Sequence, residues 1–381
     1  MNIFEKSNQI SELSAELFNY RNGLYPDFIT AARIPAVPEQ IPVFSFHNTN
    51  DVDLLPKLQY LYDNKYSTIN SSEYSYLNGC SNGERLVMLT FDDGLVSLSK
   101  VVYPLLRQFQ MKAVAFVLPG EIDHQGENGD RKLCSWAELE EMKETVDIQS
   151  HSLFHWLIYE KPEVSAFFCP DIVTRWQRID WPIPTKGKLD RPQRDFEFGA
   201  PIYKTSSRLS GAIRYFEIDS VTEACINHVG VMGGASYFNT KGWREKLMEV
   251  HNEAASGLTF EVEPENDRNS SITNCFVESK RRIESRLGKK VSGFCFPFGL
   301  GSPIGERLAA ESGYESVYYG VKANFDYMKR VTNEGIRRVT RVKDDYLFRL
   351  PGKGRKSLIQ IFYEKAKRRV TFALFKKGTV R

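Results

Sequence analysis

The chain has 381 residues, of which 41% are hydrophobic and 26% charged, and this composition excludes a disordered, fibrous or low-complexity protein. Lys and Arg total 51 against 48 Asp and Glu, and the resulting net charge of +3 is too balanced for a surface coated to bind nucleic acid. The charge is nevertheless uneven, because residues 349–381 hold eleven basic residues and one acid, which leaves a net charge of −7 on residues 1–348.

Residues 1–40 are expected to form a helix from Ser7 to Tyr20, followed by a linker marked by prolines. Glu5, Lys6 and Glu12 interrupt the apolar stretch that a secretory signal needs, so no signal peptide is predicted. No apolar run approaches the roughly 18 to 20 residues that cross a bilayer. The six cysteines are scattered without a CxxC pair, which indicates reduced thiols and a cytoplasmic chain.

Short apolar, β-branched or aromatic runs predict strands, and stretches with apolar residues three or four apart predict helices. The seven predicted strands are Val43–His47, Leu86–Phe91, Ala113–Leu118, Val146–Ser150, Val291–Phe296, Ser316–Val321 and Ile336–Val342. The helices expected between them are Leu54–Asp63, Val101–Phe109, Trp136–Lys143, Cys275–Leu287 and Ile304–Ser312. A repeated βα pattern of this kind predicts an α/β fold with a parallel sheet or barrel.

One large segment, residues 157–274, breaks this pattern between the fourth and fifth predicted strands. It contains Trp176, Trp181 and Trp243 among many prolines, glycines and charged residues. Two interpretations stay open, a subdomain that only packs beside the barrel and a lid or substrate wall over the site. We expect residues 41–156 and 275–345 to form the barrel.

Two adjacent carboxylates, Asp92 and Asp93, follow directly after the predicted strand Leu86–Phe91, with Gly94 next. Adjacent carboxylates resist joint ionisation unless a cation or hydrogen bonds stabilise them, so one can bind a metal while the other acts as a base. The alternative is a turn in which both acids are solvated.

Two histidines, His151 and His155, follow the predicted strand Val146–Ser150 at a spacing that puts both on one face of a helical turn. Two imidazoles and one carboxylate make a three-ligand set that leaves coordination positions for water and substrate. A pair of surface histidines is the alternative. Parallel barrels collect functional groups at the C-terminal ends of their strands, so the position of both motifs favours the metal site.

Two more strand ends carry candidate site residues. Cys295, Pro297 and Phe298 lie in a Phe-Cys-Phe-Pro-Phe-Gly sequence that predicts an apolar site wall and a turn. His47 closes the first predicted strand. Alone it fits a structural histidine, whereas its position at the same rim as Asp92 makes it a candidate acid or substrate ligand.

These motifs resemble those of the polysaccharide deacetylases related to the NodB chitooligosaccharide deacetylase, known as carbohydrate esterase family four. The resemblance covers about Ile41–Trp156 and Cys275–Val342. It implies a deformed (β/α)₇ barrel with a large insertion between the fourth and fifth strands.

The resemblance also implies roles for the motif residues. Asp92 would be the general base, while Asp93, His151 and His155 would hold one divalent metal. Zinc fits this ligand set, and cobalt, nickel and iron accept the same ligand types.

The chain departs from the family pattern at two points. Cys295 stands where an arginine usually orients the base, and Arg337 or Arg338 near the seventh strand is the expected replacement. The late Leu-x-His motif that supplies the general acid in many members is absent, because no histidine follows His251. A subgroup similar to the poly-N-acetylglucosamine deacetylases uses a histidine from the first strand, which makes His47 the best replacement for the acid.

The implied reaction is hydrolysis of the acetamido group of an amino sugar in bacterial surface polysaccharide or glycolipid biosynthesis. The sugar could be nucleotide-linked, lipid-linked or oligomeric. Two alternatives stay open: a deformylase or other amide hydrolase acting on a lipid-linked sugar, and an inactive glycan-binding protein without metal.

Residues 346–381 are expected to form a basic amphipathic tail. Its apolar residues recur at three- and four-residue steps: Leu358, Ile359, Phe362, Tyr363, Ala366, Val370, Ala373 and Leu374. One interpretation is a helix that docks its apolar face on the barrel with solvated charges. The other is peripheral attachment to the anionic inner face of a membrane.

Overall fold

The structure is a computed structural model that describes residues 18, 20–23, 25–32, 34–125, 131–175, 197–320 and 335–378. Nearly all of the predicted helix Ser7–Tyr20 lies outside these residues, as do Trp176 and Trp181. The chain divides into two compact units. The first comprises Met1–His151, Ser279–Leu300 and Gly313–Arg381, and the second comprises Ser152–Glu278 and Gly301–Ser312.

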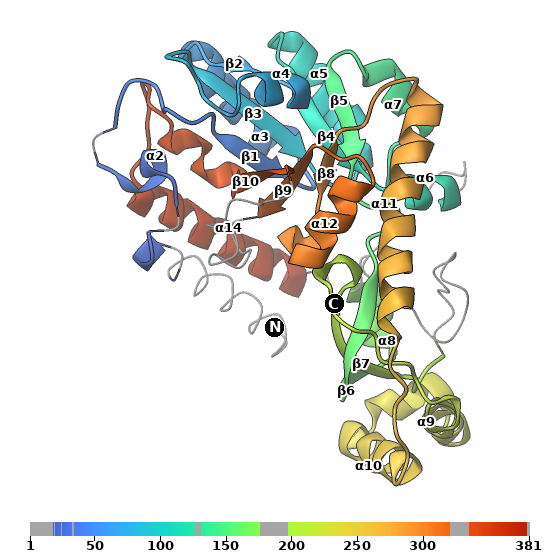
Figure 1. Ribbon diagram of the computed structural model, residues 1–381. Helices are drawn as coiled ribbons and strands as arrows, with labels where there is room; N and C mark the ends of the chain where they lie inside the picture. The colour runs from blue at the N-terminus through green and yellow to red at the C-terminus, as the bar shows by residue number, and fades with distance from the viewer. Residues whose placement is uncertain are drawn as a thin grey trace. The chain divides into compact units, whose positions relative to one another are not determined.

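Seven parallel strands close into a barrel in the first unit (Figure 1). Their order around the barrel is β1 (Val43–Phe46), β10 (Arg337–Lys343), β9 (Ser316–Gly320), β8 (Gly293–Cys295), β5 (Val146–Ser150), β4 (Ala113–Val117) and β3 (Leu86–Phe91). Parallel pairing between β1 and β3 closes the ring, and the short strand β2 (Ser67–Thr68) pairs with β3 outside it. All seven predicted strands are confirmed, and with them the predicted (β/α)₇ barrel.

Strands β3 and β4 of the barrel wall are buried on both faces. Every residue of β3 and β4 is buried, because one face points into the barrel and the other is covered by helices. One buried cluster within the barrel strands includes Val43, Met88, Val114, Phe116, Cys295, Tyr318 and Val339. Burial on both faces explains why the sequences of β3 and β4 are continuous apolar runs without alternating polar residues.

The first unit also contains helices before, between and after its strands. They are α2 (Asp27–Thr30), α3 (Asp51–Asp63), α4 (Ser71–Tyr76), α5 (Tyr103–Gln108), α6 (Pro119–His124), α7 (Trp136–Met142) and α14 (Leu358–Gly378), with the π-helix η1 (Leu98–Val102) and the 3₁₀ helices η4 (Pro297–Gly299) and η5 (Asp344–Arg349). Side-chain caps define several starts. The Asn50 side chain accepts from the Asp53 backbone N–H at 2.8 Å, so α3 begins before the predicted Leu54. Ser135 and Glu138 form a capping box at the start of α7.

The second unit contains a two-stranded antiparallel sheet and several helices. These elements are β6 (Leu157–Phe167), β7 (Pro201–Ser207), α8 (Pro170–Arg175), α9 (Asp219–Val231), α10 (Trp243–Ala255) and α12 (Pro303–Glu311), with the turns η2 (Arg208–Ser210) and η3 (Gly234–Asn239). The long helix α11 (Glu265–Leu287) starts well before the predicted Cys275. Its first residues are almost all polar, so they show no apolar periodicity.

The predicted insertion 157–274 supplies most of the second unit and has a core of its own. Buried residues in this core include Phe167, Cys225, Val229, Tyr237 and Leu247. A buried ion pair joins Arg208 to Glu263, with its two N–H···O contacts at 2.6 and 2.5 Å. The unit is larger than the predicted insertion, because it starts at Ser152 and also takes in Gly301–Ser312.

Neither disulfides nor membrane spans are found in the described part of the chain. All six cysteines have free thiols, and only Cys80 is exposed. Among the described helices, none combines the length and apolar character needed to cross a bilayer.

Candidate active site

Strand register places His47 beside Asp92. Phe46 of β1 lies opposite Phe91 of β3. The residues that follow these two strands, His47 and Asp92, are therefore neighbours. The Nε2 atom of His47 lies 3.5 Å from Oδ2 of Asp92. The His47 side chain is 65% exposed while that of Asp92 is buried. A solvent-accessible imidazole therefore stands over a buried carboxylate at the C-terminal end of the barrel.

An arginine inside the barrel holds the Asp92 carboxylate. Arg341 of β10 donates from Nη1 to Oδ1 at 2.6 Å and from Nη2 to Oδ2 at 2.8 Å, a two-pronged ion pair in which both side chains are buried. Nη1 also donates to Thr90 Oγ1 at 3.0 Å, and the guanidinium lies 5.4 Å from the centre of the Phe116 ring. These contacts fix the orientation of Asp92.

The expectation that Arg337 or Arg338 replaces the missing family arginine is wrong. Arg337 stands at the start of β10 and donates to the Ser75 carbonyl at 3.0 Å. Arg338 lies on the opposite face of the strand from Arg341, since neighbouring strand residues alternate. Arg341 is placed at the C-terminal half of β10, which is where the side chain of Asp92 can be reached. The sequence held one clue to this. Val339 is an apolar residue of the barrel core, and Arg341, two residues later, lies on the same face of the strand.

The ion pair determines the charge state of Asp92. Burial alone would raise the pKa of the carboxyl group, but the charge of Arg341 and its hydrogen bonds lower this pKa well below the ordinary value of 3.8. His151 and His47 act in the same direction. Asp92 is therefore a carboxylate at neutral pH and can accept a proton.

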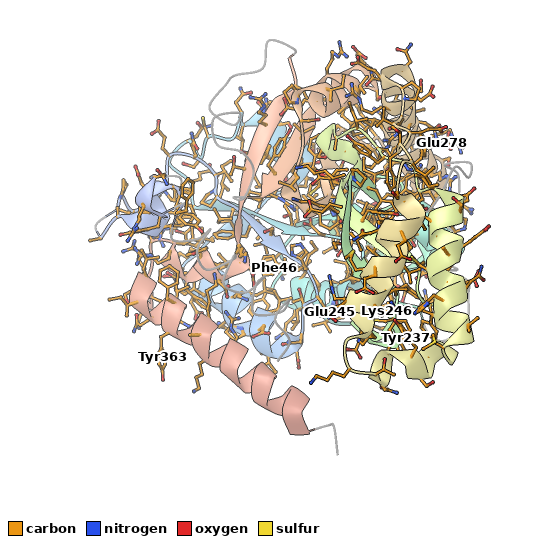
Figure 2. The ribbon with its side chains drawn as sticks, turned by 90° about the horizontal axis from the view of Figure 1, so that it is seen from below. Phe46, Tyr237, Glu245, Lys246, Glu278 and Tyr363 are labelled. Atoms are coloured by element: carbon orange, nitrogen blue, oxygen red, sulfur yellow. The ribbon has the colours of Figure 1, made fainter. Side chains whose placement is uncertain are left out.

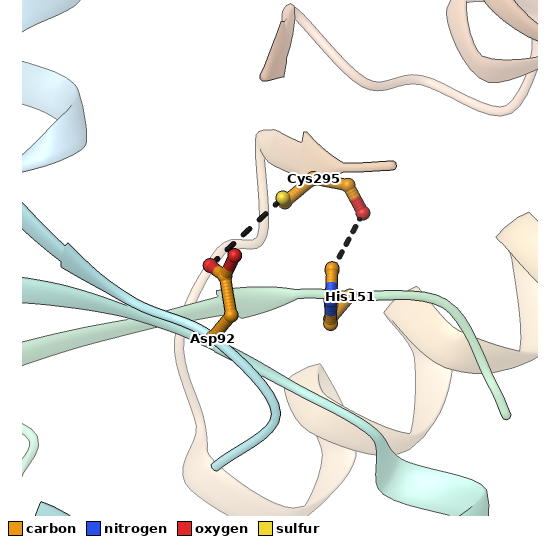
Figure 3. Close-up of side chains that lie close together, drawn as sticks. All are labelled: Asp92, His151 and Cys295. Atoms are coloured by element: carbon orange, nitrogen blue, oxygen red, sulfur yellow. Dashed lines mark hydrogen bonds between the residues drawn. The ribbon is translucent and has the colours of Figure 1, made fainter. Parts of the chain in front are cut away.

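Asp93 and His151 face each other beside Asp92. The Nε2 atom of His151 lies 3.4 Å from Oδ1 of Asp93. The other ring nitrogen, Nδ1, lies 2.8 Å from the Cys295 backbone carbonyl, which can only accept, so Nδ1 carries a proton (Figure 3). In the neutral ring this leaves the Nε2 lone pair directed toward Asp93, the arrangement expected of a metal-binding histidine held by a second partner.

Within the described ranges of the chain, two groups of side chains could hold a metal ion. Asp93, His151 and His155 each offer a ligand atom within 4.8 Å of the others, and so do Asp92, His151 and Cys295. Burial raises the pKa of the Cys295 thiol, which makes it a poor ligand. Both carboxylate oxygens of Asp92 are already paired with the Arg341 guanidinium. The donor set of the first group therefore fits a divalent metal better, and these are the three residues that the sequence analysis offered as ligands.

Strained backbone marks two of the strand ends. Asp93, which follows β3, has a φ of 70°, and Phe298, in η4 after β8, has a φ of 58°. Residues other than glycine rarely adopt such angles, and they persist where the surroundings impose them, often at active sites. At Gly299 a side chain is excluded, since a Cβ atom would lie 2.8 Å from the backbone nitrogen of Gly320. These turns aim the residues that follow β3 and β8.

The structure changes the expected site wall. The Cys295 side chain is fully buried in the barrel and its Sγ lies 4.0 Å from Oδ1 of Asp92, so it does not form a wall as expected (Figure 3). Pro297 is also buried, in η4. Phe298 is 39% exposed, so it remains the candidate wall residue of this motif.

Comparisons with known proteins agree with this site. The polysaccharide deacetylase family model matches residues 80–168, which include Asp92, Asp93, His151 and His155. A putative polysaccharide deacetylase of Bacillus subtilis (strain 168), YxkH, is 27% identical over 128 residues. This match covers 31% of the chain and 44% of the relative, so it spans less than half of the relative's length.

Three solved structures show a similar course of the chain. A de-N-acetylase from Aggregatibacter actinomycetemcomitans has 16% sequence identity and a TM-score of 0.49, and the match covers 80% of this chain and 95% of the other. The BpsB deacetylase domain from Bordetella bronchiseptica has 15% identity, a TM-score of 0.48 and coverages of 82% and 99%. IcaB from Ammonifex degensii has 14% identity, a TM-score of 0.45 and coverages of 84% and 99%.

Proposed function

We propose that this chain, which belongs to the polysaccharide deacetylase family, is a metal-dependent N-deacetylase that hydrolyses the acetamido group of an amino sugar. The observation that carries the proposal is the geometry at the barrel rim. Asp92 is held as a carboxylate by Arg341, and it lies beside the facing donor atoms of Asp93 and His151. One site thus offers a proton acceptor, Asp92, and separate metal ligands, Asp93 and His151.

The ligand set has the composition that a hydrolytic metal requires. Bound by Asp93, His151 and His155, a divalent metal would polarise the amide carbonyl and lower the pKa of a water molecule. Asp93 contributes the negative charge of this set. The Cys295 carbonyl fixes the ring of His151, so that its Nε2 atom needs no reorientation before it binds. Zinc suits these ligands, and cobalt, nickel and iron accept them too.

Asp92 and His47 are the proposed proton carriers. An Asp92 oxygen takes the proton from the attacking water, while Arg341 prevents the carboxylate from rotating away. His47 is exposed and adjacent to Asp92, so its Nε2 atom can give a proton to the leaving amine. The roles are thus divided between a buried base and an accessible acid.

The proposed substrate is an N-acetylated amino sugar, attached to a nucleotide, a lipid or an oligosaccharide, in bacterial surface polysaccharide or glycolipid biosynthesis. The test is elemental analysis of the purified protein, followed by assays of acetate and formate release from N-acyl glucosamine in these three forms. We expect bound metal and acetate release. Formate release alone would instead identify a deformylase, and a metal-free protein that releases neither acid would identify a glycan-binding protein.

Removal of a metal ligand is expected to lower metal content and activity together. In His155→Ala, and equally in His151→Ala, one of three ligands is lost, so metal binding should weaken by about 10-fold or more. The measurement is metal content after dialysis at limiting zinc, alongside acetate release. His228→Ala in α9 removes a histidine outside the ligand set and serves as the control. Full metal content in both ligand variants would disprove the assignment.

Replacement of His47 should affect turnover but not metal content. Because a general acid contributes about 10² to 10⁴ in rate, His47→Ala is expected to lower kcat by at least about 10². Its metal content should equal that of the unmodified protein, since His47 contacts Asp92 rather than the ligand set. The pH dependence of kcat should lose its alkaline limb in the variant. An unchanged kcat and pH profile would assign the acid to another group.

A further inference from the structure

The helix α14 docks on the barrel through a face that is partly charged. Ile361 is buried, and so is Lys365, four residues later. Lys365 Nζ lies 3.3 Å from Oδ2 of Asp345 and 4.8 Å from the centre of the Tyr346 ring. The helix is therefore not held by a purely apolar face with its charges in solvent, as one interpretation of the sequence expected.

Apolar side chains remain on the opposite side of α14. Ile359 is 81% and Tyr363 68% exposed, and Ala366 is exposed as well. These residues are spaced by four and three, so they form one stripe along the helix. Figure 2 shows Tyr363 pointing away from the barrel. A helix that only packs against its own domain would carry polar residues at these positions.

The docked side of α14 lies near the catalytic end of the barrel. Nη1 of Arg368 is 3.9 Å from Oδ1 of Asp53, and the same guanidinium donates to Asp345. Asp53 belongs to the first turn of α3, shortly after His47, and Asp345 belongs to η5, which follows β10. The docked part of α14 thus contacts the segments that leave the catalytic ends of two barrel strands.

The beginning of α3 extends this surface. Val52 is 77% exposed and, together with Lys367, it lines a cavity of about 240 Å³ between α3 and α14. Leu55 on the same helix is also exposed. The exposed Val52 of α3 and the basic Lys367 of α14 therefore lie on the same side of the first unit.

We propose that this surface, comprising the outward stripe of α14 and the exposed start of α3, docks on an anionic lipid bilayer. Residues 349–381 contain eleven basic residues against the single acid Glu364. That charge complements anionic headgroups, while the apolar stripe can enter the boundary between headgroups and acyl chains. The rest of the chain is acidic overall and would be repelled by the same surface.

This inference goes beyond the proposed deacetylase activity, because it concerns where the enzyme meets its substrate. Docking through α14 would hold the catalytic end of the barrel close to the membrane, where a lipid-linked sugar presents its acetamido group. The two proposals can fail separately. Vesicle binding without acetate release would leave the docking surface standing, and acetate release without vesicle binding would leave the activity standing.

Co-sedimentation of the full chain with phosphatidylcholine vesicles, with and without phosphatidylglycerol, tests the surface. We expect binding only to the anionic vesicles and weaker binding at high salt. Ile359→Ser/Tyr363→Ser should lower the affinity at least tenfold. Tyr76→Ser/Val231→Ser removes two equally exposed apolar residues elsewhere and should change nothing. Thermal unfolding and acetate release from a soluble oligosaccharide should be alike in all variants.

The basic residues have a matched test of their own. Lys367→Gln/Lys376→Gln/Lys377→Gln should weaken binding by roughly fivefold per lysine. Lys161→Gln/Lys241→Gln/Lys246→Gln changes the net charge equally at exposed lysines of the second unit and should bind as the unmodified chain does. Absence of binding to anionic vesicles overturns the proposal, and so does binding that the α14 and control variants share equally. Self-association that the stripe variant abolishes, without vesicle binding, would assign the surface to a second copy of the chain.

Discussion

Arg341→Met is expected to destabilise the protein by about 3 to 5 kcal/mol at neutral pH, because it leaves the buried Asp92 carboxylate without its counterion. Methionine is unbranched, flexible and apolar, so it can occupy much of the space beside Phe116, and packing loss is the smaller part of this effect. Chemical denaturation at pH 7 measures the change. Metal content should be retained, because Arg341 does not contact the ligand set.

The size of this effect should depend on pH in a defined direction. In the unmodified protein Arg341 keeps the pKa of Asp92 below 3.8, which contributes stability at pH values above 3.8 that is lost as the pH falls through the lower, folded-state pKa. In Arg341→Met burial is no longer opposed by the guanidinium, so the pKa of Asp92 rises. The stability difference between the two proteins should therefore be largest near pH 7 and shrink toward acidic pH.

Activity gives a second measurement on the same variant. As the pKa of Asp92 rises, the acidic limb of the kcat/KM profile should move to higher pH, since the base must be ionised to act. Arg341→Lys keeps the charge but not the two-pronged geometry, so its profile should lie between the other two. Identical pH profiles and equal stability at pH 7 for Arg341→Met and the unmodified protein would refute the role given to Arg341.

The barrel could be predicted from the sequence because its strands are short apolar runs, each ending at a polar or turn residue. The chemistry-bearing residues Asp92, Asp93 and His151 follow such runs immediately, so their meeting at one rim follows from parallel pairing. The extent of α11 could not be predicted in the same way. Its first residues are polar and gain their helical conformation from tertiary context rather than from a visible periodicity.

The details of the site required side-chain positions. Cys295 belongs to a motif expected at the site wall, yet the alternation of β8 turns its thiol into the barrel. Arg341 was not predicted because the sequence does not show which face of β10 points toward Asp92. Three arginines occur in β10, and only the register of β10 with β1 and β9 decides which of them reaches Asp92. The residue types in the sequence identified the candidate site residues, but their positions along the strands decide which of them face the site.

Asp92→Asn is expected to lower kcat by about 10² to 10⁴ while metal remains bound, because an amide cannot accept the proton from water. The substitution is nearly isosteric, but it leaves the Arg341 guanidinium buried without a counterion. A loss of folding could therefore be mistaken for a loss of catalysis. Acetate release must be normalised to folded, metal-containing protein measured by circular dichroism and elemental analysis.

The double variant Asp92→Asn/Arg341→Met separates these two effects. Both charges of the buried pair are then removed, so its free energy of unfolding should exceed that of either single variant. Its turnover should nevertheless stay as low as that of Asp92→Asn, because the base is still missing. The second substitution should thus raise stability and leave turnover unchanged. If restored stability brought back near-normal acetate release, the proton acceptor would be a group other than Asp92, and the Asp92–Arg341 pair would serve only to hold the barrel together.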